Sequence, residues 1–317
     1  MTVALDIFRA LADATRLRIL ALLRRMELSV GELAQVLGQS QPRVSRHVKI
    51  LCDAGLAERR KEGSWVFVAL GAADKVAPAA AAIDSWERAE PDHWATADAA
   101  RLAAVRADRA ASAAAWFQGH ADEWDAIRSL HVAESEVEAA MAAVLGDGPI
   151  GTLIDIGTGT GRMLELFAGQ AESALGIDRS SEMLRLARVK LEGQANTELR
   201  QADLYALPLP DGAADVAILH HVLHFAQQPG AAIGEAARVL GPGGRLLIAD
   251  FASHDREDLR VSDAHTRLGF GDAQVATWFA AAGLGEPRIE TLEGGELTVK
   301  LWLGRRPGVS LREVKAA

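Results

Sequence analysis

The sequence predicts an α/β protein in two parts, a winged helix-turn-helix at the N-terminus and a Rossmann-like α/β domain at the C-terminus. Residues 28–51 have the pattern of a helix, a tight turn and a basic helix, and residues 56–68 that of a basic hairpin. Beyond Gly148, short apolar runs alternate with helical stretches around one glycine-rich loop, which is typical of a mostly parallel sheet. At 317 residues and 49% hydrophobic composition, the chain is long enough for both domains.

Charge divides the chain in the same way. Residues 1–70 hold eleven Lys and Arg against seven Asp and Glu, a net of +4, whereas the remainder carries −13. This asymmetry indicates that the first part meets a polyanion. No uncharged apolar run approaches membrane-spanning length and the first residues carry charges, so we expect a cytoplasmic protein without a membrane partner. Cys52 is the only cysteine, which excludes an intramolecular disulfide and a thiolate-rich metal site.

The helix-turn-helix carries the side chains expected of a DNA-binding element. Gly38 supplies the turn, and Ser40 is placed to cap the second helix. Val44, Val48 and Leu51 are spaced to hold that helix to the domain. A charged face is often only solvated surface, but a basic helix followed by a basic hairpin favours DNA contact. The predicted DNA-contacting residues are Ser40, Gln41, Arg43, Ser45, Arg46, Lys49, Arg59, Arg60 and Lys61.

Two stretches of this part, LADATRLRIL (11–20) and QPRVSRHVKIL (41–51), resemble the ArsR/SmtB family of winged-helix repressors, over about residues 4–70. The resemblance implies a homodimer that binds an inverted-repeat operator in double-stranded DNA. Arsenic and cadmium sensors of that family carry paired cysteines where this chain has Ser29 and Gly31, so the resemblance does not extend to a metal inducer. Cys52, at the end of the recognition helix, is interpreted as a small buried hydrophobe.

An alanine-rich segment over 72–115 follows, interrupted by Pro78 and Pro91. Alanine favours helix and has no bulky side chain to fill a core, so we expect closely packed helices that serve as a spacer or a dimer interface. The predicted domains are a winged-helix DNA-binding domain over 1–71, a helical linker or dimerisation segment over 72–115, and a ligand-binding α/β domain over 116–305.

Apolar runs predict the strands of the second part. They lie at 152–156, 174–177, 214–219, 245–249, 288–292 and 297–303. Only four residues, EGGE, separate the last two runs, so these should form an antiparallel hairpin in an otherwise mostly parallel sheet.

The strongest chemical signal is the strand 152–156 running into the loop Gly157-Thr158-Gly159-Thr160-Gly161. Glycines let the backbone turn sharply and approach a ligand, and Arg162 stands where a dinucleotide fingerprint needs a glycine, which argues against NAD. Asp178 follows the second strand, where a carboxylate can accept hydrogen bonds from ribose hydroxyls. Asp203 is placed at the end of a third strand, between the runs 174–177 and 214–219, where it can accept from an adenine amino group. Each Asp alone is more typical of a loop or cap, but at successive strand ends they indicate a nucleoside site.

The stretches DIGTGTG (155–161), DVAILHH (215–221) and ARVLGPGGRL (237–246), with Asp178 and Asp203-Leu204, resemble the class I S-adenosylmethionine-dependent methyltransferases. The resemblance covers about residues 112–305 and is greatest to the small-molecule group that includes ubiquinone-biosynthesis enzymes. It implies a class I methyltransferase fold that binds S-adenosyl-L-methionine (SAM) or S-adenosyl-L-homocysteine (SAH). The implied cofactor-binding residues are Asp155, Gly157, Thr158, Gly159, Gly161, Asp178, Arg179, Met183, Asp203, Leu204, His220 and His221.

The resemblance also suggests what these residues contact. Asp155 and the glycines would line the methionine part, and His220 and His221 would form the floor near the sulfonium. Trp116, Phe117 and Trp124 match an aromatic segment that often covers the cofactor in this group, although simple packing of a helix on the sheet explains them equally well.

The histidines leave several interpretations open. His220 and His224 have the i, i+4 spacing of a helical metal pair, and His254 and His265 follow later strands. A metal site needs further ligands that spacing does not reveal, so we assign none. A histidine near the sulfonium could equally be a general base or a polar wall of the pocket, so no catalytic residue is assigned.

The tandem arrangement resembles the SAH-responsive regulators within the ArsR family, which control methionine-cycle genes. A ligand that favours one dimer geometry shifts operator affinity through a coupling free energy. The sequence therefore predicts a transcriptional repressor with SAH or SAM as its effector. The rival hypothesis is an active SAM-dependent small-molecule methyltransferase with an autoregulatory DNA-binding domain, and one chain could combine both activities.

Overall fold

The computed structural model describes residues 2–62, 65–89, 94–105, 107, 133–146 and 148–308. The chain divides into two compact units, Met1–Ser112 and Ala113–Ala317, and each is described by itself. None of the helices in these ranges is long and apolar enough to cross a membrane.

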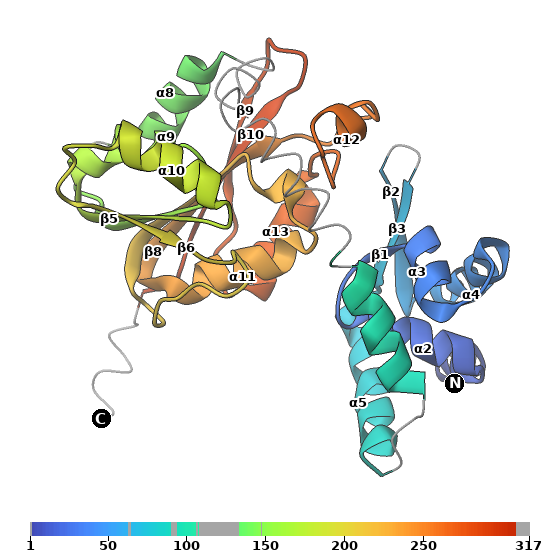
Figure 1. Cartoon of the computed structure of the whole chain (residues 1–317). Coiled ribbons are helices and arrows are strands. Elements are labelled where there is room, and N and C mark those ends of the chain that lie inside the picture. Colours follow the sequence, from blue (N-terminus) through green and yellow to red (C-terminus); the bar gives the residue numbers. More distant parts are fainter. Residues whose placement is uncertain are drawn as a thin grey trace, which may run out of the picture. The chain divides into compact units, whose positions relative to one another are not determined.

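The N-terminal unit combines helices with a three-stranded sheet (Figure 1). Its elements are α1 (Thr2–Leu11), α2 (Ala14–Leu23), β1 (Leu28–Ser29), α3 (Val30–Leu37), α4 (Gln41–Asp53), β2 (Ala57–Glu62), β3 (Trp65–Leu70) and α5 (Ala73–Ala89), with a further helix over 94–105. β2 and β3 pair antiparallel, and the short β1 pairs with the other edge of β3. The predicted winged helix-turn-helix is confirmed. The sequence analysis did not predict β1, and the tip of the wing, 63–64, lies outside the described residues.

The turn between α3 and α4 follows from its residues. Gly38 ends α3 in the left-handed conformation, with φ 64°, which glycine adopts without steric cost. Ser40 stands at the N-cap of α4, but its side chain makes no capping hydrogen bond. Val44, Val48 and Leu51 are fully buried on the inner face of α4, as predicted.

Much of the alanine-rich segment packs onto this unit. Ile83 of α5 and Leu102 of the helix over 94–105 are buried in its hydrophobic core. The Arg18 guanidinium of α2 donates to both carboxylate oxygens of Asp98, at 2.7 and 2.6 Å. Asp98 is only 3% exposed, so this ion pair joins the helix to the DNA-binding unit in a largely dry environment.

Replacing Asp98 with alanine should therefore lower the free energy of unfolding of the N-terminal unit. The Arg18 side chain is 16% exposed, and leaving it without its carboxylate should cost about 2–4 kcal/mol. Denaturant unfolding together with hydrogen exchange of the helix over 94–105 measures this loss. The matched control is Asp84→Ala, because Asp84 pairs with Arg24 where both side chains are about a third exposed, and the cost should stay below about 1 kcal/mol. Equal losses in the two variants would contradict the prediction.

The C-terminal unit is built on a seven-stranded sheet with the strand order β6-β5-β4-β7-β8-β10-β9. The strands are β4 (Gly151–Ile156), β5 (Ala171–Asp178), β6 (Thr197–Gln201), β7 (Ala214–His220), β8 (Leu240–Phe251), β9 (Arg288–Leu292) and β10 (Val299–Arg305). The helices are α8 (Glu134–Leu145), α9 (Arg162–Phe167), α10 (Ser181–Lys190), α11 (Pro229–Val239), α12 (Leu259–Ser262) and α13 (Asp272–Ala281), with 3₁₀ turns η2 (Ala168–Gln170) and η3 (Leu223–Phe225).

The sheet has a helical layer on each face. α8 and α9 pack on one face, and α11 and α13 pack on the other (Figure 1). β10 runs antiparallel to both β8 and β9, whereas β6, β5, β4, β7 and β8 are parallel, so the predicted sheet and its terminal hairpin are confirmed. The chain runs outward from β4 through β5 to β6 and then returns to β7 on the other side of β4. Ligands bind open α/β sheets at such a switch point, beside the carboxyl ends of the strands.

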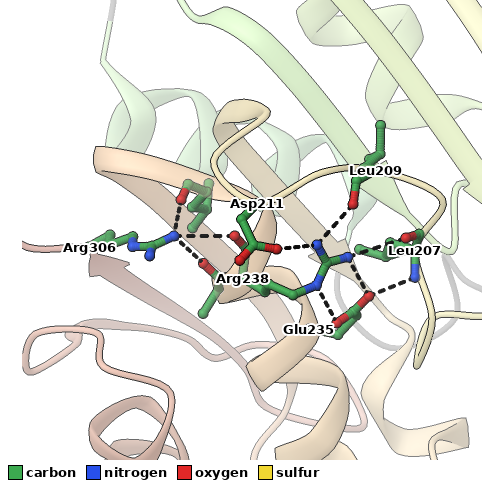
Figure 2. A network of polar contacts seen from close by, with 8 residues as sticks. Leu207, Leu209, Asp211, Glu235, Arg238 and Arg306 are labelled. Atoms are coloured by element: carbon green, nitrogen blue, oxygen red, sulfur yellow. Dashed lines mark hydrogen bonds and ion pairs between the residues drawn. The ribbon is translucent and has the colours of Figure 1, made fainter.

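A polar network fastens the loop between β6 and β7 to α11 (Figure 2). The Arg238 guanidinium donates to Glu235 at 2.7 and 2.8 Å and to Asp211 at 2.7 Å. It also donates to two loop carbonyls, those of Leu207 at 3.2 Å and Leu209 at 2.9 Å. One arginine thus supports both the helix and the loop.

Replacing Arg238 with alanine should lower the free energy of unfolding of the C-terminal unit by about 1–2 kcal/mol, because the substitution removes several charge-assisted hydrogen bonds from a partly exposed site. Thermal unfolding of the two proteins measures the difference. Arg185→Ala is the matched control, since the Arg185–Glu182 pair joins neighbouring turns of one helix and both side chains are at least 40% exposed. A variant Arg238→Ala as stable as this control would show that the network does not stabilise the fold.

Candidate functional site

The loop after β4 is shaped by glycines in the left-handed region of backbone conformation. Gly157, Gly159 and Gly161 have φ values of 78°, 53° and 85°. A Cβ added at Gly157 would lie 2.4 Å from the side chain of Val222, and one at Gly161 would lie 3.0 Å from that of Leu191. The loop therefore needs glycine both for its turns and for its close packing.

Hydrogen bonds hold this loop over the end of the sheet. The Gly157 and Thr158 amides both donate to the Ile177 carbonyl, at 2.7 and 2.9 Å. The Thr158 hydroxyl donates to Asp155 Oδ2 at 2.6 Å, and both side chains are buried. Asp155 thus supports the loop from inside the end of β4, and its contact with the methionine part of a cofactor remains a prediction.

Asp178, the last residue of β5, joins the loop to the next strand. Its Oδ2 accepts from the Gly159 amide at 2.8 Å, and its Oδ1 accepts from the Ser180 amide at 2.7 Å. Burial raises the pKa of Asp178 above its ordinary value, and the backbone hydrogen bonds oppose that rise. We call the backbone of Gly157–Gly161 the glycine cradle. A fixed carboxylate beside this cradle suits a ligand with adjacent hydroxyls, such as a ribose.

The other predicted residues near β5 and β6 differ in their surroundings. Asp203 is exposed, and its Oδ1 accepts from the Tyr205 amide at 3.0 Å in a turn. Leu204 is half-buried and Arg179 is exposed. Met183 is 2% exposed in α10, and its backbone amide donates to the capping Ser180 hydroxyl at 3.2 Å, so its side chain lies in the core.

His220 is the last residue of β7 and His221 follows it, on the side of β4 away from β5. His220 is buried with its Nε2 3.4 Å from Glu134 Oε1. His221 has φ 50°, uncommon for a residue other than glycine, and its amide donates to the Ala249 carbonyl at 2.8 Å. Because β6, β5, β4 and β7 are parallel, their carboxyl ends place Asp203, Asp178, the glycine loop and these histidines along one edge of the sheet, as the sequence predicts.

The structure adds a buried acid that the sequence analysis did not identify. Asp250, near the end of β8, is fully buried, and its Oδ1 lies 2.8 Å from Nδ1 of His224. Burial raises the pKa of Asp250 to about 6, and the nearby His221 opposes that rise. An acid inside the apolar run LLIADF (246–251) was the available signal. His220 and His224 do not form a helical pair, because one ends a strand and the other lies in η3.

The predicted DNA-contacting residues lie on α4 and β2. Arg43 and Arg46 are exposed, and neither forms an ion pair with another described residue. Lys49 pairs with Asp53 at 2.7 Å, and Arg59 donates to the Ser45 carbonyl of α4 at 2.7 Å, which ties the wing to the helix. The remaining predicted positions Ser40, Gln41 and Lys61 are also exposed, whereas the side chain of Arg60 lies outside the described residues.

Ser29, which stands where the metal sensors carry a cysteine, caps a helix in this chain. The Ser29 hydroxyl accepts from the Glu32 amide at 3.2 Å, and Glu32 Oε2 accepts from the Ser29 amide at 2.7 Å, which is a capping box for α3. Cys52 is half-buried against the core, and burial raises the pKa of its thiol. A thiol with a raised pKa is less reactive, in agreement with a packing role.

Part of the predicted site falls outside the described residues. Trp116, Phe117 and Trp124, the predicted aromatic cover, and the boundary predicted after residue 115 lie within 108–132. The cover and the boundary both remain predictions.

Comparisons with known proteins agree with the two folds. Residues 13–59 match the family model described as bacterial regulatory protein, arsR family, and residues 154–248 match that of a methyltransferase domain. The chain is 48% identical over 63 residues to the arsenical resistance operon repressor of Escherichia coli K12, covering 20% of this chain and 54% of the repressor. It is 33% identical over 166 residues to the phosphatidylethanolamine N-methyltransferase of Cereibacter sphaeroides, covering 51% of this chain and 80% of that enzyme.

A solved structure shows the same fold for the C-terminal unit. It is the complex of the Haloferax volcanii Trm112 methyltransferase activator with a candidate methyltransferase, which aligns with TM-score 0.54 and 18% identity over 62% of this chain and 99% of that one. The fold and the site define a two-domain protein in which a DNA-binding domain is fused to a methyltransferase domain. The chain belongs to the methyltransferases through its second domain, and its first domain is similar to bacterial regulatory proteins of the arsR family. Two further relatives are matched over less than half of their length: the chain covers 40% of one from Streptomyces fradiae and 46% of one from Thermus thermophilus.

SAH affinity should fall as the pH is lowered through the raised pKa of Asp178. In the predicted site ribose hydroxyls would donate to this carboxylate, so binding should favour the charged form of Asp178 and protonation should oppose it. Once the pH is below that pKa, affinity should fall up to about tenfold for each further unit. Calorimetric titration at a series of decreasing pH values, with Asp178→Asn measured in parallel, follows this dependence. The decline should be absent in Asp178→Asn, and a wild-type affinity that is constant across the range would contradict the prediction.

Proposed function

We propose that this protein is a transcriptional repressor whose affinity for its operator is controlled by SAH or SAM bound in the methyltransferase domain. The observation that carries the proposal is the presence, in one chain, of an exposed basic recognition helix and of a glycine cradle with a carboxylate at the adjacent strand end. A DNA site and a metabolite site in one protein allow linkage, so a ligand that favours one dimer geometry changes operator affinity.

The cradle fits the nucleoside end of such an effector. Three left-handed glycines leave no Cβ between the backbone and a ligand, and Asp178 stands beside them as the ribose acceptor. SAH and SAM differ at the sulfur, by one methyl group and one positive charge. The buried His220 and His221 therefore lie where discrimination between the two compounds would occur.

The DNA-binding half acts as a homodimer on an inverted repeat in this proposal. Two copies of α4 would enter successive major grooves, and the wing would follow the backbone. Ser29 caps a helix in place of a sensor thiol, so the regulatory signal comes from the second domain, with methionine-cycle genes as the expected targets.

The test is operator binding by fluorescence anisotropy with SAH and, separately, SAM titrated into the full chain at fixed salt. The expected result is a saturable change in operator affinity with at least one compound. Gly159→Arg should abolish the response but leave DNA binding intact, because its side chain fills the cradle. Gly169→Arg is the matched control, since a Cβ at Gly169 meets nothing within 4 Å. Specific operator binding that is indifferent to both compounds would refute the proposal.

An active methyltransferase is the second candidate, favoured by the match to an enzyme named phosphatidylethanolamine N-methyltransferase over 80% of that enzyme's length. Incubation with SAM and vesicles containing phosphatidylethanolamine, followed by measurement of SAH, tests this substrate. The chain also matches an arsenite methyltransferase of Aquipseudomonas alcaligenes over 34% of that enzyme's length. The only cysteine here, Cys52, belongs to the N-terminal unit, so the second domain has no thiolate for a soft arsenic centre.

A further inference from the structure

Five histidines gather at the carboxyl ends of β7 and β8. His220 ends β7, His221 and His224 follow it, and His254 and His265 come from the segment after β8. All except His254 are buried. The rings of His224 and His265 lie 4.3 Å apart between centroids, and those of His220 and His221 lie 4.6 Å apart. Aliphatic side chains would pack such a site without the cost of burying polar rings, so this composition calls for a chemical explanation.

Three groups converge within this cluster. One ligand atom from each of His221, His224 and Asp250 lies within 4.8 Å of the other two, and none of the three residues is more than 4% exposed. We propose that these residues bind a divalent first-row transition-metal ion. Two imidazoles and one carboxylate match the ligands that zinc, iron, manganese and cobalt take in proteins.

The surrounding backbone holds the carboxylate in place for this role. Asp250 Oδ2 accepts from the amides of Leu223 at 2.9 Å and His224 at 3.3 Å, and Oδ1 accepts from the amide of Phe251 at 2.8 Å. Such outer hydrogen bonds orient metal ligands and are retained when the ion binds. They also explain how a carboxylate is maintained in a fully buried position.

Ion binding requires a small local change. Asp250 Oδ1 and His224 Nδ1 are now joined through a proton at 2.8 Å, and the ion takes the place of that proton, which is released to solvent. The three ligand atoms draw together until each bond to the ion is roughly 2.0–2.2 Å. His221 has a left-handed backbone conformation, with φ 50°. This conformation is strained for a residue other than glycine, and such strain is concentrated at functional sites.

This site lies apart from the glycine cradle and shares only His221 with the predicted cofactor site. Asp178 and Asp203 follow β5 and β6 on one side of β4, whereas the three metal ligands follow β7 and end β8 on the other side. Three protein ligands leave coordination positions open for an outside ligand. The ion is thus a further ligand of the second domain, and its assignment does not depend on the proposed SAH response.

The test begins with full-length protein dialysed against a chelator. Cobalt(II) is titrated in and followed by its visible absorption, and zinc(II) binding is measured by calorimetry. The expected result is one ion bound per chain. His221→Gln and His224→Gln should each lower the affinity by more than about 100-fold, since the loss of a direct ligand exceeds the 10–100-fold cost of losing an outer hydrogen bond.

His254→Gln is the matched control, because His254 belongs to the same ring cluster but lies outside the ligand triad, and it should bind the ion as the wild type does. Thermal unfolding of the metal-free proteins identifies a variant that has lost its fold, and if one ligand variant fails to fold, the other takes its place. The absence of saturable binding in the wild type would overturn the proposal. Unchanged affinity in the folded ligand variants, or equal loss in His254→Gln, would also overturn it.

Discussion

Replacing Asp178 with asparagine is expected to weaken SAH binding by at least about 100-fold, because it removes two charge-assisted hydrogen bonds worth about 1.5–3 kcal/mol each. The carboxylate accepts from the Gly159 and Ser180 amides and is the predicted acceptor for both ribose hydroxyls. The side-chain nitrogen of asparagine is a donor, and it would face the backbone amides or the ribose hydroxyls, which are donors as well. Calorimetric titration with SAH measures the change.

The matched control is Asp215→Asn. Asp215 also accepts a backbone amide, that of Thr152 at 2.8 Å, but it lies at the amino end of β7, at the edge of the sheet opposite to the cradle. This variant should bind SAH as the wild type does. Full affinity in Asp178→Asn, with its fold verified by thermal unfolding, would show that the ribose does not contact Asp178.

Replacing Arg43 and Arg46 together with alanine is expected to weaken operator binding by at least about 30-fold, because each side chain that contacts a base or phosphate contributes roughly 1–3 kcal/mol. Both arginines are exposed on α4 without an ion pair to a described residue, so they are available to DNA. Anisotropy with an operator selected from random duplex DNA, repeated at several salt concentrations, measures affinity and salt dependence. The slope of log affinity against log salt should become less steep by about 1 for each phosphate that the variant no longer neutralises.

Arg9→Ala is the control for charge alone. Arg9 is an exposed arginine of α1 in the same unit, 3.6 Å from Asp6, and its removal should change operator affinity little. SAH binding should be unchanged in all of these variants. If the α4 variant retained full affinity, α4 would not be the recognition helix.

Local chemistry made most of the fold predictable. Gly38 adopts the left-handed turn that ends α3, and Val44, Val48 and Leu51 recur at helical spacing and are fully buried. The apolar runs of the second part became strands because each one is bounded by turn or loop residues. β1 was missed because its two residues pair with β3 and have no strand pattern of their own.

The cradle was predictable for a related reason. G-x-G-x-G after an apolar strand implies left-handed turns, and the structure gives positive φ at all three glycines. Asp178 and Asp203 were identified because parallel strands bring their carboxyl ends to one edge. The environment of Met183 was not predictable, since position in a helix after a strand does not decide whether a side chain faces a ligand or the core.

The two folds, the basic recognition helix and the glycine cradle could be predicted from the sequence, because each depends on residues close together in the chain and on their spacing. Which distant residues meet became known from the three-dimensional structure. It pairs Arg18 with Asp98 across 80 positions, and it brings His221 and His224 together with Asp250, a group that the His220–His224 spacing does not indicate. The burial of Asp250 and its closeness to the two histidines depend on how β7 and β8 pair in the sheet. No local sequence pattern encodes the distance between residues of these two strands.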